Sequence, residues 1–407
     1  MTSTRTHETV DLLIVGSGPA GISTALHLVR SDPRWARRLV VVDRAVHPRE
    51  KLCGGGVTRS GEEVLRDLGL GFPEGHVSIR ELRLVFGDRG WAVRGEPVFR
   101  VVRRAELDHW LVRAAEREGI EVRQGERVED LAVAADAVEV RTERATYRAR
   151  VLVGADGSKG TVRRRLGWAA GARQARLLEV LTPERPDPGD HAVAGSPWRG
   201  VAVFDFTPMT EGVHGYYWDF PSLVGGRPMM NRGVFDSRIG RGLPRRPLKE
   251  ILEDALVRRG RTLEDGRLAG HPILWFDRGA RVAGERVLLA GDAAGVDPLF
   301  GEGISFALRH GRVAAEAVAD AFGRNDFGFA GYRERLLEDP LLGHLPRRKR
   351  VARVAYALGG ALGWWPLWSL VPWAARALMS YRPGILPLED GRLERVRAQP
   401  EELRTGA

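Results

Sequence analysis

The chain has 407 residues, 43% of them hydrophobic and 29% charged, so it is long enough for two domains and too apolar for a disordered protein. Its single cysteine, Cys53, excludes an internal disulfide and a cysteine-pair metal site, and it suits a reducing, cytoplasmic compartment. The net charge of +10 comes from arginines spread along the chain, with one tight cluster at 347–350 and no nucleic-acid-binding module, so we expect neither a nucleic acid partner nor a metal site.

The first residues, MTSTRTHETVDLLIVGSG, contain a short apolar run that leads directly into glycines, which favours a buried strand over a signal peptide. A helix with small residues follows to residue 30, and a second apolar strand ends at Asp43. The glycines form a complete GxGxxG. Strand, glycine turn, helix, strand and acid together are the dinucleotide-binding fingerprint in its required context, whereas an isolated glycine turn would be weak evidence.

Each residue of the fingerprint has a physical role. Gly16 permits the tight turn, Gly18 lets the backbone approach a pyrophosphate at the helix N-terminus, and Gly21 lets helix and strand pack closely. The carboxylate of Asp43 can accept hydrogen bonds from a ribose diol. The residues that we expect to contact the dinucleotide here are Gly16, Gly18, Pro19, Ala20, Gly21, Asp43 and Arg44.

The sequence KLCGGG at 51–56 places the only cysteine beside three glycines. Glycines remove side chains where the backbone must approach another group closely. A lone cysteine before a glycine turn is more often a buried, inert thiol than a reactive one. The residues alone leave both interpretations of Cys53 open.

The middle of the chain reads as strands around one helix. An amphipathic helix is expected at 103–119, with Arg104 at its start either near a cofactor or simply solvated. Alternating apolar residues predict strands at 78–87, 91–101, 200–208, 212–222 and 227–237. These strands suggest an antiparallel sheet that is split by an insertion of the dinucleotide-binding domain.

Two later motifs repeat the pattern of a strand followed by an aspartate. GADGS places Asp156 just after a strand, and AGDAAG places Gly291 and Asp292 after another. Each acid would lie at the carboxyl edge of a sheet, where ligands bind, although an aspartate there can also be a plain helix cap. A helix expected from about Gly303 would aim its N-terminus at an anionic ring edge. Three such motifs in order favour FAD as the cofactor.

The segment from 354 to 375 contains no charged residue and four tryptophans. Its length could span a bilayer, but Pro366, Pro372 and the central position of the tryptophans argue against a span. A helical hairpin at a membrane surface and a helix pair that covers a pocket are the two remaining interpretations.

The motif set resembles a group of flavoproteins that includes aromatic hydroxylases, flavin halogenases and geranylgeranyl reductases. KLCGGG at 51–56 and YYWDFP at 216–221 are similar to the geranylgeranyl reductase family, and PLFGEGI at 298–304 also fits. The resemblance implies an α/β fold in which a Rossmann-like FAD-binding domain is interleaved with an antiparallel-sheet substrate domain and followed by a C-terminal helical segment. The implied boundaries are 1–77, 102–166 and 277–345 for the FAD-binding parts, 78–101 and 167–276 for the substrate domain, and 346–407 for the helical, Trp-rich segment.

The resemblance also implies site residues. Cys53 and Gly55 would be catalytic, with Cys53 shaping the pocket, ordering a water or donating a proton. Tyr216, Trp218, Phe220 and Pro221 would hold the substrate. The remaining implied cofactor contacts are Cys53, Gly54, Gly55, Arg104, Asp156, Gly291, Asp292, Pro298, Gly301, Gly303 and Ile304.

The activity implied is saturation of C=C bonds in an isoprenoid chain, as in lipid biosynthesis, with electrons from NAD(P)H or ferredoxin. A monooxygenase or halogenase on the same scaffold is one alternative, and a flavin-bearing membrane-associated binding protein without turnover is another. We expect a cytoplasmic protein with peripheral contact to the inner face of the membrane.

Overall fold

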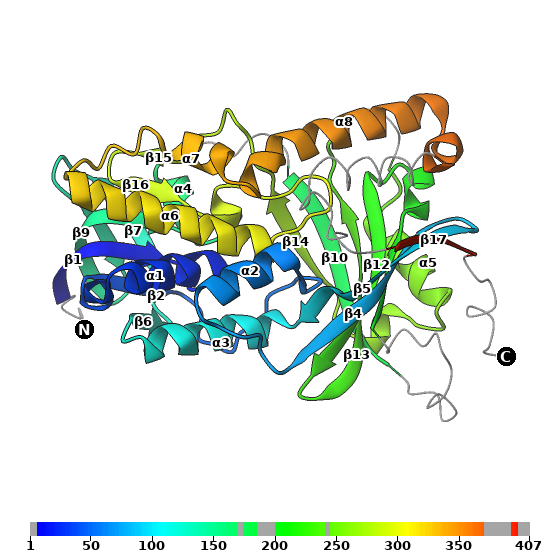
Figure 1. The fold of residues 1–407 in the computed structure, drawn as a ribbon, viewed down its shortest axis with the longest axis horizontal. Coiled ribbons are helices and arrows are strands. Elements are labelled where there is room, and N and C mark those ends of the chain that lie inside the picture. Colours follow the sequence, from blue (N-terminus) through cyan, green and yellow to red (C-terminus); the bar gives the residue numbers. More distant parts are fainter. Residues whose placement is uncertain (1–5, 169–173, 185–199, 241–244, 370–391, 398–407) are drawn as a thin grey trace.

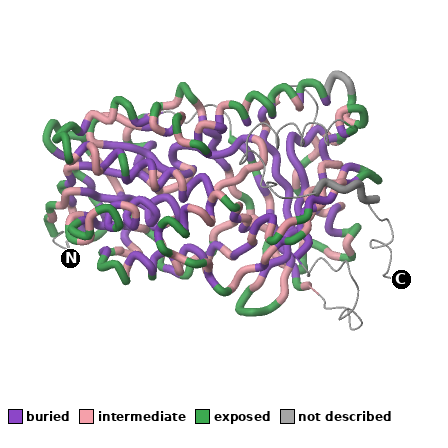
Figure 2. Tube along the Cα trace, viewed as in Figure 1, coloured by how far each residue is buried: buried purple, intermediate pink, exposed green. Residues whose placement is uncertain are grey.

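The structure is a computed structural model, and it describes residues 6–168, 174–184, 200–240, 245–369 and 392–397. Two layered units lie side by side, one a sheet covered by helices and the other a large twisted sheet (Figure 1). Each unit has a buried interior, and the outer side of helix α8 carries many exposed residues (Figure 2). The expected α/β architecture is confirmed.

The first sheet is mainly parallel. Its order is β15-β16-β9-β1-β2-β6, and β7 and β8 form an antiparallel extension of β9. Leu12, Leu13 and Ile14 are fully buried, as expected for a parallel strand covered on both faces. The strands are β1 (Thr6–Val15), β2 (Leu39–Asp43), β6 (Glu121–Gln124), β7 (Val128–Val133), β8 (Val138–Thr142), β9 (Ala145–Gly154), β15 (Ala283–Gly284) and β16 (Val287–Leu289).

Helices cover this sheet, and two of them pack very closely. Against helix α1, helix α6 presents Gly311, where an added Cβ would lie 2.5 Å from the Cβ of Ser23. Ser23 Oγ also donates a hydrogen bond to Leu308 O at 2.7 Å. The helices of the first unit are α1 (Pro19–Ser31), α2 (Arg59–Asp67), α3 (Arg104–Arg117), α4 (Thr161–Arg165), α6 (Ile304–Arg324) and α7 (Tyr332–Glu338), with the short 3₁₀ turns η1 (Pro33–Arg37), η5 (Gly291–Ala293) and η6 (Leu342–His344).

The strand register brings the three predicted aspartate motifs to one edge of the sheet. Val15 is paired with Val42 on one side and with Gly154 on the other, and Gly154 is paired with Leu289. The residues that follow these strand ends are Gly16, Asp43, Asp156 and Asp292. Motifs that are more than 270 residues apart therefore meet at the carboxyl edge, where ligands bind in such sheets.

The second sheet has the order β14-β10-β13-β12-β11-β4-β5-β17, with β3 also paired to β5. All pairs are antiparallel except β11 and β4, which run parallel and are joined by a long stretch of chain. Its strands are β3 (Gly56–Thr58), β4 (His76–Phe86), β5 (Arg89–Val102), β10 (Gln174–Pro183), β11 (Val201–Asp205), β12 (Gly215–Val224), β13 (Arg227–Asp236), β14 (Ala269–Leu274) and β17 (Arg392–Arg397).

The two faces of the second sheet have different partners. Tyr217 on β12 and Val180 on β10 pack with Ile251 and Leu256 of helix α5 (Leu248–Val257), which covers one face. The 3₁₀ turns η3 (Thr207–Glu211) and η4 (Leu263–Asp265) complete this domain. Since side chains alternate along a strand, Tyr216, Trp218 and Phe220 face the other way, toward the first unit.

The C-terminal segment begins with helix α8 (Leu345–Leu362), which runs along the upper side of the second sheet (Figure 1). A further helical turn follows to residue 369, and β17 then adds to the edge of β5. The segment is therefore helical in its first part and contributes a strand in its second. Pro372 and Trp373 of the Trp-rich stretch lie outside the described residues. Within the described part of the chain, no helix is long and apolar enough to cross a membrane.

Candidate functional site

One cavity of about 2070 Å³ lies between the carboxyl edge of the first sheet and the open face of the second. Most of the predicted site residues line it: Gly16, Gly18, Pro19, Ala20, Asp43, Arg44, Cys53, Gly54, Gly55, Arg104, Asp156, Asp292, Gly301, Gly303, Ile304, Tyr216, Trp218 and Phe220. Gly21, Gly291, Pro298 and Pro221 do not belong to its lining. Pro221 stands on the other face of β12 by strand alternation.

The glycine turn is packed so tightly that side chains are excluded. Gly16 has φ +111°, and a Cβ there would lie 2.4 Å from Ala155 O. At Gly21 a Cβ would lie 1.9 Å from Gly16 O, so the helix and the turn touch. Gly18 differs, because the nearest atoms to an added Cβ are guanidinium nitrogens of Arg104 at 3.8 Å and Arg49 at 3.9 Å.

Those two guanidinium groups share one buried carboxylate. Arg104 Nε and Nη2 donate to Asp108 at 2.8 Å each, and Arg49 Nη2 lies 3.0 Å from the same carboxylate. Burial opposes the ionisation of Asp108, but Arg104 and Arg49 outweigh it and hold the pKa of this carboxyl below its usual value. Two positive charges against one negative charge leave a net positive site in front of the N-terminus of α1, which suits a pyrophosphate.

The Asp43 carboxylate is already engaged by the glycine turn. Ser17 donates to Asp43 Oδ2 from its backbone N at 2.7 Å and from Oγ at 2.8 Å, and Ala45 N donates to Oδ1 at 2.8 Å. His47 Nε2 lies 2.7 Å from Ser17 Oγ. Asp43 therefore fixes the turn in addition to facing the cavity, where its remaining lone pairs can accept from a ribose.

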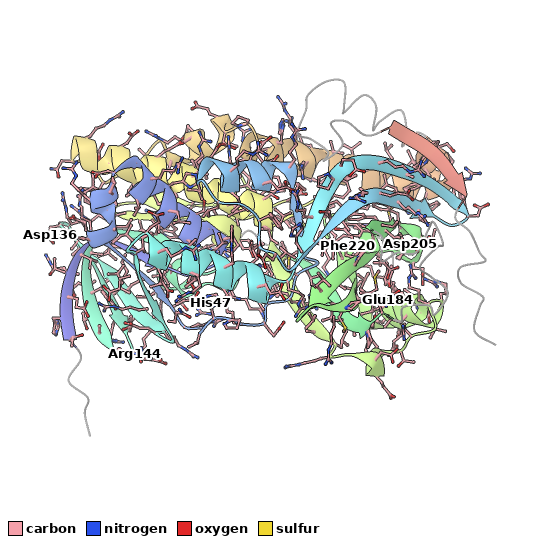
Figure 3. The ribbon with its side chains drawn as sticks, turned by 60° about the horizontal axis from the view of Figure 1, so that its bottom comes forward. His47, Asp136, Arg144, Glu184, Asp205 and Phe220 are labelled. Carbon is pink, nitrogen blue, oxygen red and sulfur yellow. The ribbon has the colours of Figure 1, made fainter. Side chains whose placement is uncertain are left out.

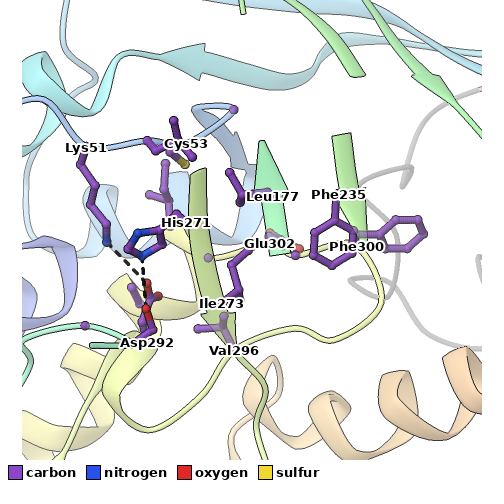
Figure 4. Close-up of a pocket in the computed structure, with 18 of the residues that line it drawn as sticks. Lys51, Cys53, Leu177, Phe235, His271, Ile273, Asp292, Val296, Phe300 and Glu302 are labelled. Carbon is purple, nitrogen blue, oxygen red and sulfur yellow. Dashed lines mark hydrogen bonds and ion pairs between the residues drawn. The ribbon is translucent and has the colours of Figure 1, made fainter. Parts of the chain in front are cut away.

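Asp156 and Asp292, the other two aspartates at this edge, have different partners. Asp156 Oδ2 accepts from the backbone N of Thr161 and, at 3.0 Å, of Val162, so this residue caps helix α4 while it lines the cavity. Asp292 forms an ion pair with Lys51 at 3.4 Å (Figure 4). Burial opposes the ionisation of Asp292, yet Lys51 and Arg104 keep the pKa of its carboxyl below the usual value. Burial lowers the pKa of the neighbouring His271 to about 4, so this ring is neutral at pH 7.

The loop before α6 is held by buried charges. Asp297 Oδ1 and Oδ2 accept from the backbone N of Leu299 and Phe300 at 2.9 and 3.1 Å. Arg348 of α8 is paired with Asp297 at 2.8 Å and with Glu302 at 3.2 Å. Asp297 and Arg348 are both buried, so this network ties α8 to the loop that leads the N-terminus of α6 into the cavity.

The three glycines of KLCGGG each meet a protein neighbour. Gly55 has φ +80°, and a Cβ there would lie 2.4 Å from Val102 O. A Cβ on Gly54 would lie 3.1 Å from the ring of Phe220, and one on Gly56 would lie 3.6 Å from Phe99. Glycines are expected where the backbone approaches another group closely. Here those groups belong to the protein itself, since the loop is pressed against β5 and the ring of Phe220.

Cys53 lies at the centre of this loop, accessible from the cavity but deep in the protein. Burial raises the pKa of its thiol, so the thiol is protonated at neutral pH. Gly55 N donates to Cys53 Sγ at 3.4 Å. Asn231 Nδ2 donates to Cys53 O at 2.9 Å, and Trp218 Nε1 donates to Asn231 Oδ1 at 2.9 Å. The second sheet therefore holds the cysteine loop directly.

An aromatic wall continues from this loop along the open face of the second sheet. Tyr216 contacts Phe204 with ring centroids 4.6 Å apart, and Phe204 contacts Phe220 at 5.1 Å. Phe220 lies on this sheet, whereas His47 belongs to the first unit (Figure 3). The hydroxyl of Tyr216 donates to Phe300 O and is therefore occupied. Further aromatic residues in the lining are Phe99, Phe206, Phe235, Phe300, Trp364 and Trp368.

Helix α8 forms one side of the cavity where it meets solvent. Arg347, Arg350, Val351, Val354 and Leu358 are exposed and also line the cavity, with Val354 58% exposed. These residues lie on one side of the helix by their spacing. The described part of the Trp-rich stretch thus borders the pocket, and the same side of α8 presents an apolar stripe beside arginines at the mouth of the cavity.

The residues present fit FAD. The net positive charge before α1 suits a pyrophosphate, and Asp43 and Asp292 supply acceptors for ribose and ribityl hydroxyls. The cavity is also larger than the roughly 300–1,000 Å³ that a drug-sized ligand fills. It therefore has room for a dinucleotide and a second ligand. No group of three or more His, Cys, Asp or Glu side chains among the described residues could hold a metal ion.

A family model described as an FAD binding domain matches residues 9–223, which is more than half of the chain. The chain belongs to this family of FAD-binding flavoproteins. The menaquinone reductase of Mycobacterium tuberculosis is 31% identical over 333 residues, covering 76% of this chain and 77% of the relative. Digeranylgeranylglycerophospholipid reductase 1 of Methanopyrus kandleri is 28% identical over 344 residues, covering 78% and 82%. FAD is the cofactor, and the protein is an FAD-dependent oxidoreductase of the geranylgeranyl reductase-like group.

The fold of this flavoprotein is also found in a solved structure. A geranylgeranyl bacteriochlorophyll reductase-like protein from Thermoplasma acidophilum superimposes with a TM-score of 0.69 at 20% identity, covering 86% of this chain and 87% of the other. The similarity to that structure establishes the shared fold.

Several site residues of this flavoprotein had no signal in the sequence. Arg49 and His271 line the cavity, and Asn231 donates to Cys53 O from β13, yet none of the three lies in a recognisable sequence motif. Asp108 could have been found, because it lies four residues after Arg104 on one helix face.

Proposed function

We propose that this flavoprotein saturates C=C bonds of an isoprenoid chain, the activity that its similarity to geranylgeranyl reductases implies. The observation that carries the proposal is the single cavity that runs from the FAD-binding edge, past Cys53, along an aromatic wall. Rings and aliphatic side chains bind a long hydrocarbon by burial of apolar surface and offer no partner to a polar substrate. The two relatives are named for menaquinone and for a digeranylgeranyl lipid, and both of these molecules carry isoprenoid chains.

The orientation of the substrate follows from the two ends of the cavity. The inner end near Cys53 is walled by Trp218, Phe220 and Phe99, whereas the outer end at α8 carries Arg347 and Arg350. We therefore infer that the hydrocarbon tail enters first and that the polar head stays at α8. Exposed arginines there favour a head that carries negative charge or carbonyl oxygens.

FAD held at this edge would, once reduced by NAD(P)H or a ferredoxin, supply a hydride to the isoprenoid chain. An isolated alkene accepts a hydride poorly unless the other carbon is protonated, so the protein must provide a proton. The thiol of Cys53 stays protonated because burial raises its pKa, which makes it a weak acid. The hydroxyl of Tyr216 is buried, and burial raises its pKa far above the usual value while it donates to Phe300 O.

We therefore propose that Cys53 shapes the inner end of the cavity and orders a water there, and that Gly55 contributes through its backbone. Lys51 and Asp292, which form an ion pair in the cavity lining, offer charged partners for such a water. Tyr216 acts as a wall, together with Trp218 and Phe220.

Peripheral membrane contact is a further part of the proposal. The exposed side of α8 presents Val351, Val354 and Leu358 next to Arg347 and Arg350, and Trp365 beyond it is 45% exposed. Apolar residues beside arginines bind an anionic lipid surface, and salt screens the electrostatic part. Binding to vesicles that contain anionic lipid, and partial release at high salt, would support this contact. Equal recovery in the supernatant with and without vesicles would contradict it.

Reoxidation of the bound flavin tests the proposed activity against its alternatives. Enzyme reduced without oxygen should regain its oxidised absorbance when a polyprenyl acceptor is added, and a saturated analogue should have no effect. Hydrogen peroxide or an oxygenated product in air would instead favour a monooxygenase or halogenase. No reoxidation by any polyprenyl compound would favour a binding protein.

A further inference from the structure

Glu179 is a buried acid behind the cysteine loop. It lies on β10 two residues after the cavity-lining Leu177, so its side chain points to the same face of the second sheet. It is paired with Gly233 of β13, and Gly233 is paired with Trp218 of β12. The ring of Trp218 lies over Gly233, where an added Cβ would be 2.3 Å away. Glu179 is therefore the acid next to the aromatic wall, and it is only 5% exposed.

Two side chains from this sheet hold the backbone of Cys53. Glu179 is paired with Gly233, and Asn231 stands two residues before Gly233 on the same face of β13, so Glu179 and Asn231 are diagonal neighbours. The Glu179 carboxylate also interacts electrostatically with the backbone N–H of Cys53. Asn231 in turn donates to Cys53 O at 2.9 Å. Glu179 and Asn231 thus lie beside the Cys53 loop, although they are 126 and 178 positions away in the sequence. Glu179 Oε2 has no hydrogen-bond partner among the described residues.

We propose that Glu179 is a positioning residue for Cys53, which holds its backbone together with Asn231 and places a negative charge near its thiol. The inference rests on the role proposed above for the Cys53 loop. A rigid backbone keeps the thiol in one place in the cavity, and a nearby anion favours the neutral thiol over the thiolate.

The surrounding charges support this role. Burial raises the pKa of Glu179 to about 7, Arg103 and the interactions with Cys53 and Asn231 oppose the rise, and Glu50 adds to it. For the Cys53 thiol, burial is the main cause of the raised pKa. Arg104 and Lys51 oppose it, and Glu179 reinforces it. Glu179 therefore changes its charge near neutral pH, and its ionisation raises the pKa of the Cys53 thiol.

Alkylation of Cys53 reads this interaction directly, because the chain has no other cysteine and only the thiolate reacts. The FAD-loaded protein and its Glu179→Gln variant are treated with iodoacetamide from pH 5.5 to 8.5. At pH 5.5 both should react at the same rate, since Glu179 is protonated. At pH 8.5 the variant should react about tenfold faster, which is a one-unit fall in the thiol pKa.

Glu184→Gln is the matched control. Glu184 lies just beyond β10, and burial also raises the pKa of its carboxyl, but its partner is Arg232 at 3.6 Å and it does not line the cavity (Figure 3). This control should follow the wild-type curve. Identical curves for Glu179→Gln and wild type, or an equal change in the control, would overturn the proposal.

Asn231→Ala provides a second, independent variant in case Glu179→Gln does not fold, as judged by the FAD spectrum. Losing the bond to Cys53 O should loosen the loop and raise the alkylation rate at every pH, without removing the effect of Glu179. An unchanged alkylation rate in this variant would also contradict the proposal that Glu179 and Asn231 position Cys53. None of these measurements needs an isoprenoid substrate. They would therefore still test the role of Glu179 if the proposed reductase activity were not found.

Discussion

The side-chain amide of Asn231 donates a hydrogen bond to the carbonyl oxygen of Cys53 at 2.9 Å. This bond joins the second sheet to the loop that carries the only cysteine, and Trp218 donates to the amide oxygen of Asn231 from the other side. The wall that would bind a hydrocarbon chain and the loop that lies beside the cofactor site are therefore one connected structure. A change in either should be felt by the other.

Asp43→Ala should weaken FAD binding. The substitution removes an acceptor for the ribose and also frees Ser17 of the glycine turn, and a hydrogen bond to a charged group contributes about 1.5–3 kcal/mol. The dissociation constant of FAD, measured by fluorescence titration of the apoprotein, should rise at least about tenfold. Asp11→Ala is the control, because Asp11 lies on β1 and forms an ion pair with Arg38, and neither residue lines the cavity. Equal affinities for both variants would contradict the assignment of Asp43.

Cys53→Ser should retain part of its alkene-reducing activity with a normal FAD spectrum. Serine preserves the size of the side chain and can accept the hydrogen bond from Gly55 N, and the raised pKa of the thiol makes it a poor acid. The measurement is product formation by fully reduced enzyme without oxygen, which separates alkene reduction from flavin reduction. A variant that binds FAD and substrate but forms no product would show that the thiol is the proton donor.

Gly55→Ala should be more harmful than Cys53→Ser. A Cβ at Gly55 would meet Val102 O at 2.4 Å, and its φ of +80° costs a non-glycine residue about 1–2 kcal/mol before any clash. The melting temperature and the FAD affinity should both fall. Gly71→Ala serves as the control, because no atom lies within 4 Å of a Cβ added there. If Gly55→Ala behaved like Gly71→Ala, the loop would not be held against β5 as described.

Glu179→Gln should change how stability depends on pH. Burial raises the pKa of Glu179 to about 7 in the folded protein, above the value of 4.5 for an ordinary glutamate. The folded state therefore binds more protons than the unfolded state in this range, and the free energy of unfolding falls as the pH rises from about 4.5 to 7. The full effect is on the order of 3 kcal/mol, and glutamine abolishes it.

Urea unfolding of both proteins at pH 5 and pH 8 measures this difference. Relative to wild type, Glu179→Gln should be more stable at pH 8 than at pH 5. The exposed Glu253 on α5 provides the control, since its replacement by glutamine should give nearly the same difference at both pH values. A difference for Glu179→Gln that does not vary with pH would show that this carboxyl is ionised throughout.

Local patterns predicted the FAD-binding edge well. The turn at Gly16, the strand that ends at Asp43 and the helix that begins at Ile304 are each encoded within about twenty residues, where apolar periodicity and glycines are informative. The strands around YYWDFP were also found, because β12 alternates between two buried faces.

The contacts that build the site from distant parts were not predictable from one sequence. Strands β10 and β14 had no clear signal, so Glu179 and His271 could not be placed. No local turn signal indicates the parallel pairing of β4 with β11. In helix α8, the sequence does not distinguish Arg348, which pairs with the buried Asp297, from the basic residues beside it. Such contacts depend on tertiary packing, which overrides local preference.

Mass spectrometry of the prenyl product tests the central claim most directly. Reduced, FAD-loaded enzyme is incubated without oxygen with a panel of geranylgeranyl diphosphate, a geranylgeranyl phospholipid and a prenylated quinone. The account predicts a product that is heavier by two hydrogens, or by a multiple of two, for at least one compound, and no change with heat-treated enzyme. Unchanged masses for the whole panel, or a product that gains oxygen only in air, would contradict the proposed saturation of isoprenoid double bonds.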